Sequence, residues 1–335
     1  MIRLLMADGA ASNIVRRVRE SPGSRAFELL VPPTSSEADL IAAVPPADAI
    51  LAYEAQIPAS VIRAAPALKL IQKHGLNCRK IDVAAATERN VRVATIPLLR
   101  SVSVAEHALA MMLACARKVV PGHRAVTHAV YQQMGIEPVV TAHRTYRSNW
   151  PRIEGMGELF RTTVGIVGMG DIGMEIAKRC RAFAMDIRYY QRTRHPQAIE
   201  DSLAMRYLPF DTLLAESDYV VLVLPHTSET EGIIGARELA RMKPSATLVN
   251  VGRGGLIDED ALADALRNRR IAMAALDVYR REPLPADSPL IALPNVLLLP
   301  HTGGGSYRSW EMDTPAVLQN IGLFFEGKAE GIVDA

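Results

Sequence analysis

The stretch Thr163-Val164-Gly165-Ile166-Val167-Gly168-Met169-Gly170-Asp171-Ile172-Gly173 joins a β-prone apolar run to three glycines spaced Gly-x-Gly-x-x-Gly. Residues 174–185 then repeat apolar side chains at helical spacing, and residues 186–190 form a second β-prone run. The pattern predicts a strand, a tight glycine turn, a helix and a strand. Such a turn lets the backbone approach a pyrophosphate at the N-terminus of the helix. A dinucleotide is the expected ligand, with contacts at Gly168, Met169, Gly170, Asp171, Ile172 and Gly173.

Length, charge and cysteine content set the class of protein. A chain of 335 residues can bury the cores of two domains. A net charge of +2 gives no reason to expect nucleic acid or an anionic membrane as a partner. The three cysteines, Cys78, Cys115 and Cys180, match no metal or redox spacing. With no visible signal peptide and no apolar run of membrane-spanning length, a soluble cytoplasmic protein is expected.

Apolar runs and helical patterns alternate along most of the chain, which predicts parallel sheets with helices on both faces. The expected fold class is α/β, with two doubly wound parallel-sheet domains: a Rossmann nucleotide-binding domain and a smaller flavodoxin-like domain. In the first domain the expected strands are 2–7, 27–31, 49–52, 68–72 and 91–94, with helices near 11–20, 36–43, 58–64 and 81–89. Beyond the glycine turn the expected strands are 219–225, 247–251, 271–277 and 296–299, with helices near 211–215, 235–242, 258–268 and 309–327.

Histidines gather before the glycine turn, at His107, His123, His128 and His143. Their spacing matches no zinc-ligand pattern, so we expect surface or packing histidines and no metal site.

Four polar residues follow expected strands, where an open α/β sheet binds its ligands. They are Arg253, Asp277, Glu282 and His301. Each alone has an ordinary structural explanation, but together they supply what hydride exchange at a 2-hydroxy acid requires. An imidazole donates or accepts the proton, and a carboxylate orients it and favours its charged form. A guanidinium can polarise a keto oxygen and bind a carboxylate in a forked geometry.

These residues resemble the D-isomer-specific 2-hydroxyacid dehydrogenase family, which includes phosphoglycerate, D-lactate, glycerate and hydroxypyruvate enzymes. The resemblance spans nearly the whole chain, with several long motifs in the family's order. They are Gln72-Lys73-His74-Gly75 with Ile81-Asp82, Ser103-Val104-Ala105-Glu106-His107, the glycine turn, Val249-Asn250-Val251-Gly252-Arg253-Gly254-Gly255-Leu256-Ile257-Asp258, Leu276-Asp277-Val278 with Glu282-Pro283, and Pro300-His301.

The resemblance implies a role for each matching residue. Arg253 would bind the carboxylate and carbonyl of the substrate, and Glu282 would pair with His301, the acid/base. Backbone N–H groups of Gly75, Leu76 and Asn77 would also bind the substrate carboxylate, and Asp277 would hold the nicotinamide carboxamide. Further cofactor contacts are expected at Leu224, Pro225, His226, Thr227, Val251, Gly252 and Gly303.

The resemblance also implies a discontinuous substrate domain, residues 1–100 plus 303–335, and a nucleotide-binding domain, 101–302. Hinges near 100–104 and 301–304 would allow closure over the substrate. Members of the family are typically dimers. The segment 121–156 is longer than the family norm, and we expect it in the dimer contact or as cover over the neighbouring active site.

Three loops depart from the family pattern. Gln191 stands where an NAD enzyme places an acid for the ribose 2′-hydroxyl. The adjacent Arg192, Thr193 and Arg194 favour NADP(H) or dual use, although these arginines could merely flank the adenosine of an NAD enzyme. Residues 77–79 and 98–100 bring Arg79 and Arg100 into the substrate loops. These two arginines either meet a second acidic group on the substrate or are simply solvated.

We therefore expect an NAD(P)-dependent oxidoreductase that interconverts a small-molecule 2-keto acid and its D-2-hydroxy acid. Two alternatives keep the same fold. One is a nucleotide-sensing corepressor-like binding protein, and the other is a formate- or phosphite-type dehydrogenase.

Overall fold

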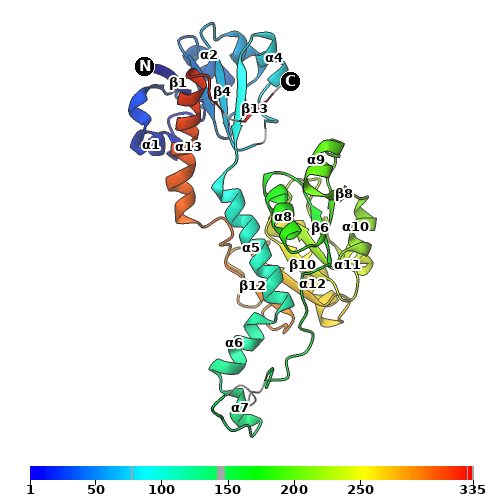
Figure 1. Ribbon diagram of the computed structural model, residues 1–335. Coiled ribbons are helices and arrows are strands. Elements are labelled where there is room, and N and C mark those ends of the chain that lie inside the picture. Colours follow the sequence, from blue (N-terminus) through cyan, green and yellow to red (C-terminus); the bar gives the residue numbers. More distant parts are fainter. Residues whose placement is uncertain (77, 142–147, 330, 334–335) are drawn as a thin grey trace. The chain divides into compact units, whose positions relative to one another are not determined.

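The structure is a computed structural model that describes residues 1–76, 78–141, 148–329 and 331–333. The chain divides into two compact units (Figure 1). Unit 1 comprises Met1–Ser101 with Ser306–Ala335, and unit 2 comprises Val102–Gly305. These boundaries differ by one and three residues from those expected from the sequence. The predicted fold class is confirmed, because each unit is built on a mainly parallel sheet with helices.

Unit 1 contains a six-stranded sheet in the order β13-β5-β4-β3-β1-β2. Its strands are buried on both faces, as the continuous apolar run Ala49–Ala52 predicts. One core lies under α2, α3 and α4, and the other lies under α1 and α13. The elements are β1 (Ile2–Met6), α1 (Asn13–Glu20), β2 (Phe27–Leu30), α2 (Glu37–Ala43), β3 (Ala49–Ala52), α3 (Ala59–Arg63), β4 (Leu70–His74), α4 (Val83–Glu88), β5 (Arg92–Ile96), α13 (Tyr307–Phe325) and β13 (Ile332–Val333).

The short strand β13 was not expected from the sequence. It pairs antiparallel with β5, through Ile332 opposite Ala94. Two residues give too short a run for alternation to be visible. The segment after α13 therefore closes the sheet edge of unit 1.

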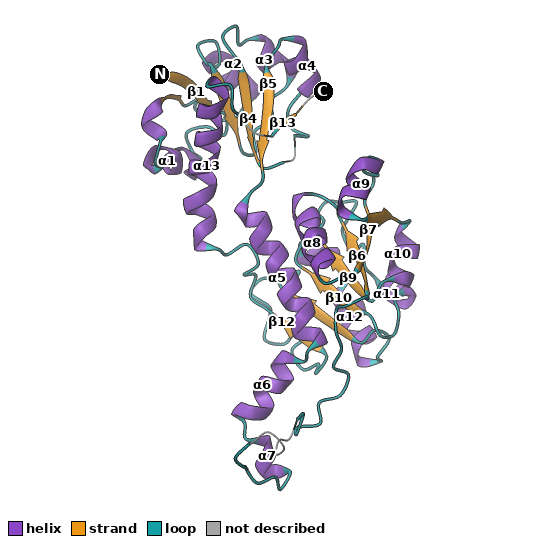
Figure 2. Cartoon of the chain, in the orientation of Figure 1, coloured by secondary structure: helices purple, strands orange, loops and turns teal. Residues whose placement is uncertain are grey.

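Unit 2 contains a seven-stranded parallel sheet in the order β12-β11-β10-β9-β6-β7-β8 (Figure 2). The chain runs outward from β6 to β8, then returns to β9 and runs outward on the other side. The switch in direction lies between β6 and β9, where such sheets bind their ligands. The strands are β6 (Thr163–Val167), β7 (Asp186–Tyr190), β8 (Met205–Tyr207), β9 (Tyr219–Leu222), β10 (Thr247–Asn250), β11 (Met273–Leu276) and β12 (Val296–Leu298).

Helices cover both faces of this sheet. α5 and α8 pack on one face, and α10, α11 and α12 pack on the other. The sequence did not reveal α9 or β8, because a short helix and a three-residue strand carry little periodicity. The bounds are α5 (Leu99–Ala116), α8 (Asp171–Ala182), α9 (Gln197–Leu203), α10 (Phe210–Glu216), α11 (Ala236–Arg241) and α12 (Glu259–Arg267).

Helix α5 begins at Leu99 and is eighteen residues long. With a mean hydropathy of 1.2, it is long and apolar enough to cross a membrane by length and composition alone. Its buried residues, however, belong to the core of unit 2, with Ala105, Ala108 and Met112 fully inaccessible. We therefore interpret α5 as a core helix.

The segment after α5 forms two helices that the sequence did not predict, α6 (Val119–Thr127) and α7 (Val130–Gln133). They project away from the sheet of unit 2 (Figure 1). Several apolar side chains of this segment are exposed, among them Val126, Val140 and Phe160.

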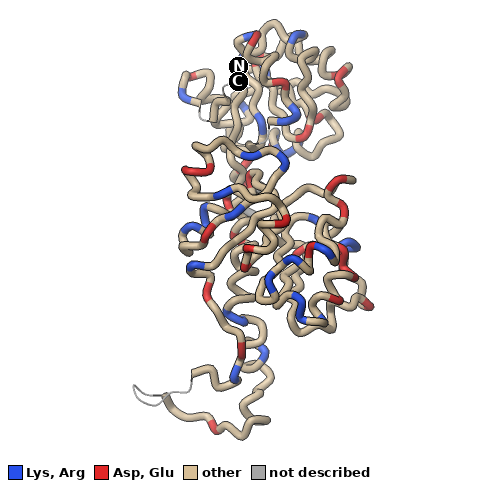
Figure 3. The backbone as a smooth tube through the Cα atoms, turned by 90° about the vertical axis from the view of Figure 1, so that its right-hand side faces the viewer, with Lys and Arg blue, Asp and Glu red and all other residues tan. Residues whose placement is uncertain are grey.

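Charged residues of both signs are interspersed along each unit (Figure 3). This agrees with the small net charge of +2.

Candidate active site

The glycine turn between β6 and α8 leaves room for a phosphate. A Cβ at Gly168 would lie 2.7 Å from the backbone oxygen of Val223, and one at Gly173 would lie 2.3 Å from that of Gly168. Gly168 also has a φ of +103°. These two glycines are required for the close packing of the turn. A Cβ at Gly170, in contrast, meets no other described heavy atom within 4 Å. The open side at Gly170 and the start of α8 at Asp171 fit the pyrophosphate of a dinucleotide.

The loop after β7 contains two arginines with different partners. Nη1 of Arg192 lies 2.5 Å from Oε2 of Glu229, and both side chains are exposed. Arg194 instead donates from Nε and Nη2 to the two carboxylate oxygens of Glu200, at 2.8 and 2.7 Å. The hydroxyl of Tyr189 also donates to Glu200. The Glu200 side chain is only 2% exposed.

The pKa of Glu200 falls to about 2, mainly because of the hydrogen bonds from Arg194. Arg194 is therefore held on a buried carboxylate, whereas Arg192 has an exposed partner that another anion can replace. The remaining polar side chain of the loop, Gln191, donates to the backbone oxygen of Thr193 at 2.6 Å.

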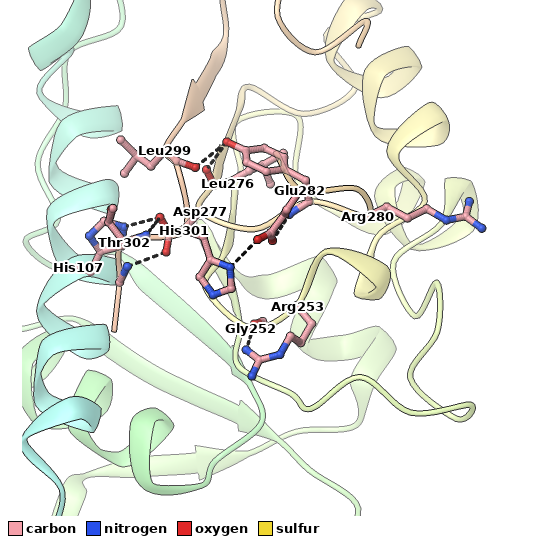
Figure 4. A network of polar contacts seen from close by, with 12 residues as sticks. His107, Gly252, Arg253, Leu276, Asp277, Arg280, Glu282, Leu299, His301 and Thr302 are labelled. Carbon is pink, nitrogen blue, oxygen red and sulfur yellow. Dashed lines mark hydrogen bonds and ion pairs between the residues drawn. The ribbon is translucent and has the colours of Figure 1, made fainter. Parts of the chain in front are cut away.

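The loop after β10 positions Arg253. The buried side chain of Asn250 accepts from the backbone N–H of Gly252 at 3.0 Å and donates to the backbone oxygen of Arg253 at 2.9 Å. A Cβ at Gly254 would lie within 2 Å of the backbone of Tyr279. The Arg253 loop is thereby packed directly on the backbone of the loop after β11, which carries Glu282. Nη1 of Arg253 donates to the oxygen of Gly252, and the guanidinium extends toward His301 (Figure 4).

Glu282 and His301 form a direct pair. Oε2 of Glu282 lies 2.6 Å from Nδ1 of His301, and Oε1 accepts from the backbone N–H of Tyr279 at 3.1 Å. Burial would raise the pKa of Glu282, but the hydrogen bonds from His301 and Tyr279 outweigh it and hold this pKa below its usual value. Glu282 is thus a carboxylate at neutral pH, and it orients the imidazole through Nδ1.

The backbone at His301 is left-handed, with a φ of +56°. Such a conformation costs a non-glycine residue about 1–3 kcal/mol and persists only where surrounding contacts hold it. Asp277, the residue that follows β11, supplies those contacts. Its Oδ1 accepts from the N–H of Thr302 at 2.9 Å, and its Oδ2 accepts from that of Gly303 at 2.8 Å. The two residues after His301 are therefore fixed by one carboxylate that is 2% exposed.

The loop after β9 contains the remaining expected cofactor contacts, Leu224, Pro225, His226 and Thr227. His226 pairs with Glu231, and its ring packs against Gly255, close to the Arg253 loop. Thr227 donates its backbone N–H to Oγ1 of Thr230 at 2.8 Å. This loop and the glycine turn follow β9 and β6, the two strands at the switch point of the sheet.

The expected substrate loop lies in unit 1, after β4. Gly75 has a φ of +100°, which favours glycine, and Asn77 lies outside the described residues. Before it, His74 stacks on Tyr53, with ring centroids 3.8 Å apart. Burial, with the nearby charges of Lys73 and Arg100, lowers the pKa of His74 to about 3. The neutral His74 ring forms a rigid platform before Gly75 and Leu76, whose role in substrate binding stays a prediction.

The histidines before the glycine turn were expected at the surface or in packing. His107 contacts Asp277, and His123 and His128 lie exposed on and after α6. His143 is outside the described residues. Among the residues that the structure describes, no group of three or more His, Cys, Asp or Glu could hold a metal ion.

Sequence reasoning missed three residues that support the site: Asn250, Tyr279 and His107. The hydroxyl of Tyr279 lies 2.8 Å from the backbone oxygen of Leu299 and 3.2 Å from that of Leu276, which links β11 to the end of β12. The available signal was modest: an Asn ending a fully apolar strand, and a His on an apolar helix.

A family model described as "D-isomer specific 2-hydroxyacid dehydrogenase, NAD binding domain" matches residues 109–303, more than half of the chain. The chain belongs to the D-isomer specific 2-hydroxyacid dehydrogenase family. The family predicted from the sequence is therefore confirmed, and so is the enzyme class, an NAD(P)-dependent oxidoreductase.

Relatives within this dehydrogenase family have two kinds of name. D-3-phosphoglycerate dehydrogenase of Archaeoglobus fulgidus is 35% identical over 302 residues, which are 90% of this chain and 53% of that protein. The chain thus spans about half the length of that relative. Glyoxylate reductase of Korarchaeum cryptofilum is 36% identical over 273 residues, 81% of this chain and 77% of that protein.

The fold is similar to that of a solved member of the family. The NADPH-dependent glyoxylate/hydroxypyruvate reductase of Sinorhizobium meliloti, in complex with citrate, is 26% identical with a TM-score of 0.62. The match covers 99% of this chain and 97% of that structure.

Proposed function

We propose that this dehydrogenase reduces a 2-keto acid to the D-2-hydroxy acid, with Arg253, Glu282 and His301 as its catalytic residues. The observation that carries the proposal is the 2.6 Å pair between Glu282 and Nδ1 of His301, beside the guanidinium of Arg253. When bound, the reduced nicotinamide supplies a hydride to the keto carbon. His301 donates the proton that the carbonyl oxygen then needs.

The contacts of each residue support this division of roles. Because Nδ1 of His301 faces Glu282, Nε2 is the atom that donates to the carbonyl oxygen. The carboxylate of Glu282 stabilises the imidazolium that is the proton donor. Arg253 has five N–H donors, and its Nη1 contact with the oxygen of Gly252 leaves others for the substrate carboxylate and carbonyl.

Other residues would hold the cofactor. The backbone from Gly168 to Gly173 would bind the pyrophosphate, and Thr227 and Gly252 would line the groove. Asp277 would accept from the nicotinamide carboxamide. A carboxylate has about four acceptor positions, and two are already engaged by hydrogen bonds, from the backbone N–H groups of Thr302 and Gly303.

We assign the 2′-phosphate of NADP(H) to Arg192. Arg194 is engaged by the buried Glu200, whereas the exposed pair of Arg192 with Glu229 is of the kind that contributes little and can exchange. Gln191 brings no negative charge against a phosphate. The Sinorhizobium meliloti relative is described as NADPH-dependent, which supports the same preference. NADP(H) or dual use is therefore proposed over strict NAD.

The relatives favour a small substrate, such as glyoxylate or hydroxypyruvate, over a larger one. If Arg79 and Arg100 face the substrate, they would bind a second acidic group on it, as in phosphohydroxypyruvate. We further propose a homodimer whose contact includes the exposed apolar side chains of Val126 and Val140, in the segment 121–156. The buried cysteines Cys115 and Cys180 form no disulfide among the described residues, which supports a reducing compartment such as the cytoplasm.

A panel of keto acids tests the proposal. Glyoxylate, hydroxypyruvate, pyruvate and phosphohydroxypyruvate are each mixed with NADPH and with NADH, and the absorbance of the reduced nicotinamide is followed. We expect turnover with at least one keto acid and a lower KM for NADPH. A preference for NADH of about hundredfold would reject the cofactor assignment. Background rates throughout would reject the reaction and favour a cofactor-sensing binding protein, whereas oxidation of formate or phosphite would identify the other alternative.

A further inference from the structure

His107, on α5, contacts the carboxylate that holds the His301 loop. Its Nε2 lies 3.0 Å from Oδ1 of Asp277, and the ring is 19% exposed (Figure 4). The Nε2 atom is buried and forms no regular hydrogen bond with the described residues, so its contact with Asp277 is oblique. The buried carboxylate is therefore the polar group that faces this nitrogen.

Gly303 lies between these two side chains. A Cβ added to Gly303 would lie 3.0 Å from Oδ2 of Asp277 and 3.2 Å from Cδ2 of His107. Both distances are shorter than ordinary carbon contacts. The backbone just after His301 is therefore enclosed by the carboxylate and the imidazole, with space for a glycine and little more. We call His107, Asp277 and Gly303 the loop clamp.

The loop clamp lies near both points where the chain passes between its two units. The chain leaves unit 1 after Ser101, within α5, and re-enters it at Ser306. His107 lies six residues after the first point, and Gly303 lies three residues before the second. One buried carboxylate thus contacts residues near the beginning and near the end of unit 2, and His301 lies near that end.

We propose that His107 is a positioning residue for the acid/base His301. It touches no reacting atom in this account, which rests on the proposed function. The His107 ring confines the Asp277 carboxylate and Gly303, and Asp277 in turn fixes the two backbone N–H groups after His301. The left-handed backbone at His301 needs that support. Without Nε2 of His107 against the carboxylate, Asp277 shifts and the imidazole of His301 loses its alignment with the substrate carbonyl.

Two substitutions at His107 and one neighbour test the proposal. His107→Phe keeps an aromatic ring but removes both nitrogens, and His107→Gln keeps a donor in place of Nε2. Glu106→Gln is the matched control, because Glu106 is exposed on the same helix and pairs with Arg179. Wild type, these variants and His301→Ala are compared for kcat, for the KM of the keto acid, for the Kd of NADPH and for Tm.

We expect His107→Phe to lower kcat by about tenfold to hundredfold, the loss that a small misplacement of a catalytic group causes. The KM of the keto acid and the Kd of NADPH should stay within about twofold of wild type. His107→Gln should recover most of kcat, and Glu106→Gln should match wild type. Unchanged kcat in His107→Phe overturns the proposal. So does a loss that follows Tm and that glutamine does not rescue, because this is the signature of a merely structural histidine.

Gly303→Ala is an independent probe if His107→Phe folds poorly. Its added Cβ meets Asp277 and His107, so kcat should fall in this variant too. His107→Ala removes one of those two contacts. The combined loss in Gly303→Ala with His107→Ala should therefore be smaller than the product of the single losses. Simple multiplication of the losses would contradict the loop clamp. A wild type without keto-acid turnover would instead reject the proposed function itself, and this inference with it.

Discussion

The loops at the two sides of the unit 2 sheet differ in how firmly their charged side chains are held by their partners. At the loops after β10, β11 and β12, Arg253 is locked by Asn250 and Gly254, and His301 is paired with Glu282. At the loop after β7, two arginines separated by one residue have partners that differ in burial. Arg194 lies on the buried Glu200, and Arg192 pairs with the exposed Glu229.

This difference teaches where a charged side chain can be assigned from its position. In the catalytic loops, side chains fix the backbone through hydrogen bonds and close packing. The positions of Arg253 and His301 are restricted as a consequence. In the β7 loop the positive charge alone does not identify the partner, because the buried carboxylate of Glu200, ten residues after the end of β7, could not be recognised as a partner of Tyr189 and Arg194. The predictions that follow test the catalytic end first and the adenosine end last.

The largest effect is expected for His301→Ala. Removing the proton donor should lower kcat by about 10²–10⁴-fold, the usual contribution of general acid catalysis. The Kd of NADPH should change little, because the glycine turn lies on other strands. Steady-state kinetics and cofactor fluorescence titration measure the two quantities. His123→Ala, at an exposed histidine on α6, is the control and should keep wild-type turnover.

Arg253→Ala should come second. Loss of the guanidinium removes donors to both the carbonyl and the carboxylate of the substrate, so kcat/KM should fall by about hundredfold with a clear rise in KM. Arg280→Ala is the matched control, since the Arg280 side chain points away from His301 (Figure 4). An Arg253→Ala enzyme with an unchanged KM would show that the substrate carboxylate binds elsewhere.

Glu282→Gln should have a smaller effect that depends on pH. The pKa of Glu282 is held low, so the wild-type side chain is a carboxylate at neutral pH and places its negative charge against Nδ1 of His301. The amide keeps an acceptor but no charge. Reduction needs the proton, so the pH above which kcat/KM declines should move about one unit lower in the variant. A pH profile of kcat/KM from about 5 to about 10 measures this shift. A profile that coincides with that of wild type would show that the charge of Glu282 has no part in the proton transfer.

The adenosine end should give the smallest effect, confined to one cofactor. Arg192→Ala should raise the KM of NADPH about tenfold and leave that of NADH within about twofold. Glu229→Gln should act in the opposite direction, because it releases Arg192 from its competitor. Arg206→Ala, on β8 at the edge of the same sheet, is the control. If Arg192→Ala changes the KM of NADH and the KM of NADPH equally, Arg192 does not bind the 2′-phosphate, and the proposed difference between Arg192 and Arg194 is wrong.

Much of the fold was predictable because its signals are long and local. The glycine turn with its flanking strands, and the apolar runs that became β9, β10 and β11, follow directly from periodicity and glycine spacing. The elements that escaped, such as β13 and α9, are short and stabilised by partners far along the chain. Pairing of Ile332 with Ala94 joins segments more than two hundred residues apart, which no local pattern records.

The site divides in the same way. Arg253, Asp277, Glu282 and His301 could be named because each ends a recognisable strand or follows one within a motif. The contacts that hold them could not, since Asn250 and Tyr279 act through the backbone of loops whose shape the sequence does not state. The contact of His107 with Asp277 is of the same kind.

Deuterium transfer tests the central claim most directly. A reduced cofactor labelled with deuterium at nicotinamide C4 is incubated with hydroxypyruvate and enzyme, and the hydroxy acid formed is analysed by mass and by chirality. We expect one deuterium on C2 of a product that is entirely the D-isomer, and formation of that product about 10²–10⁴-fold more slowly with His301→Ala. An L-product, a product without the label, or labelled product at the wild-type rate from His301→Ala would contradict the central claim.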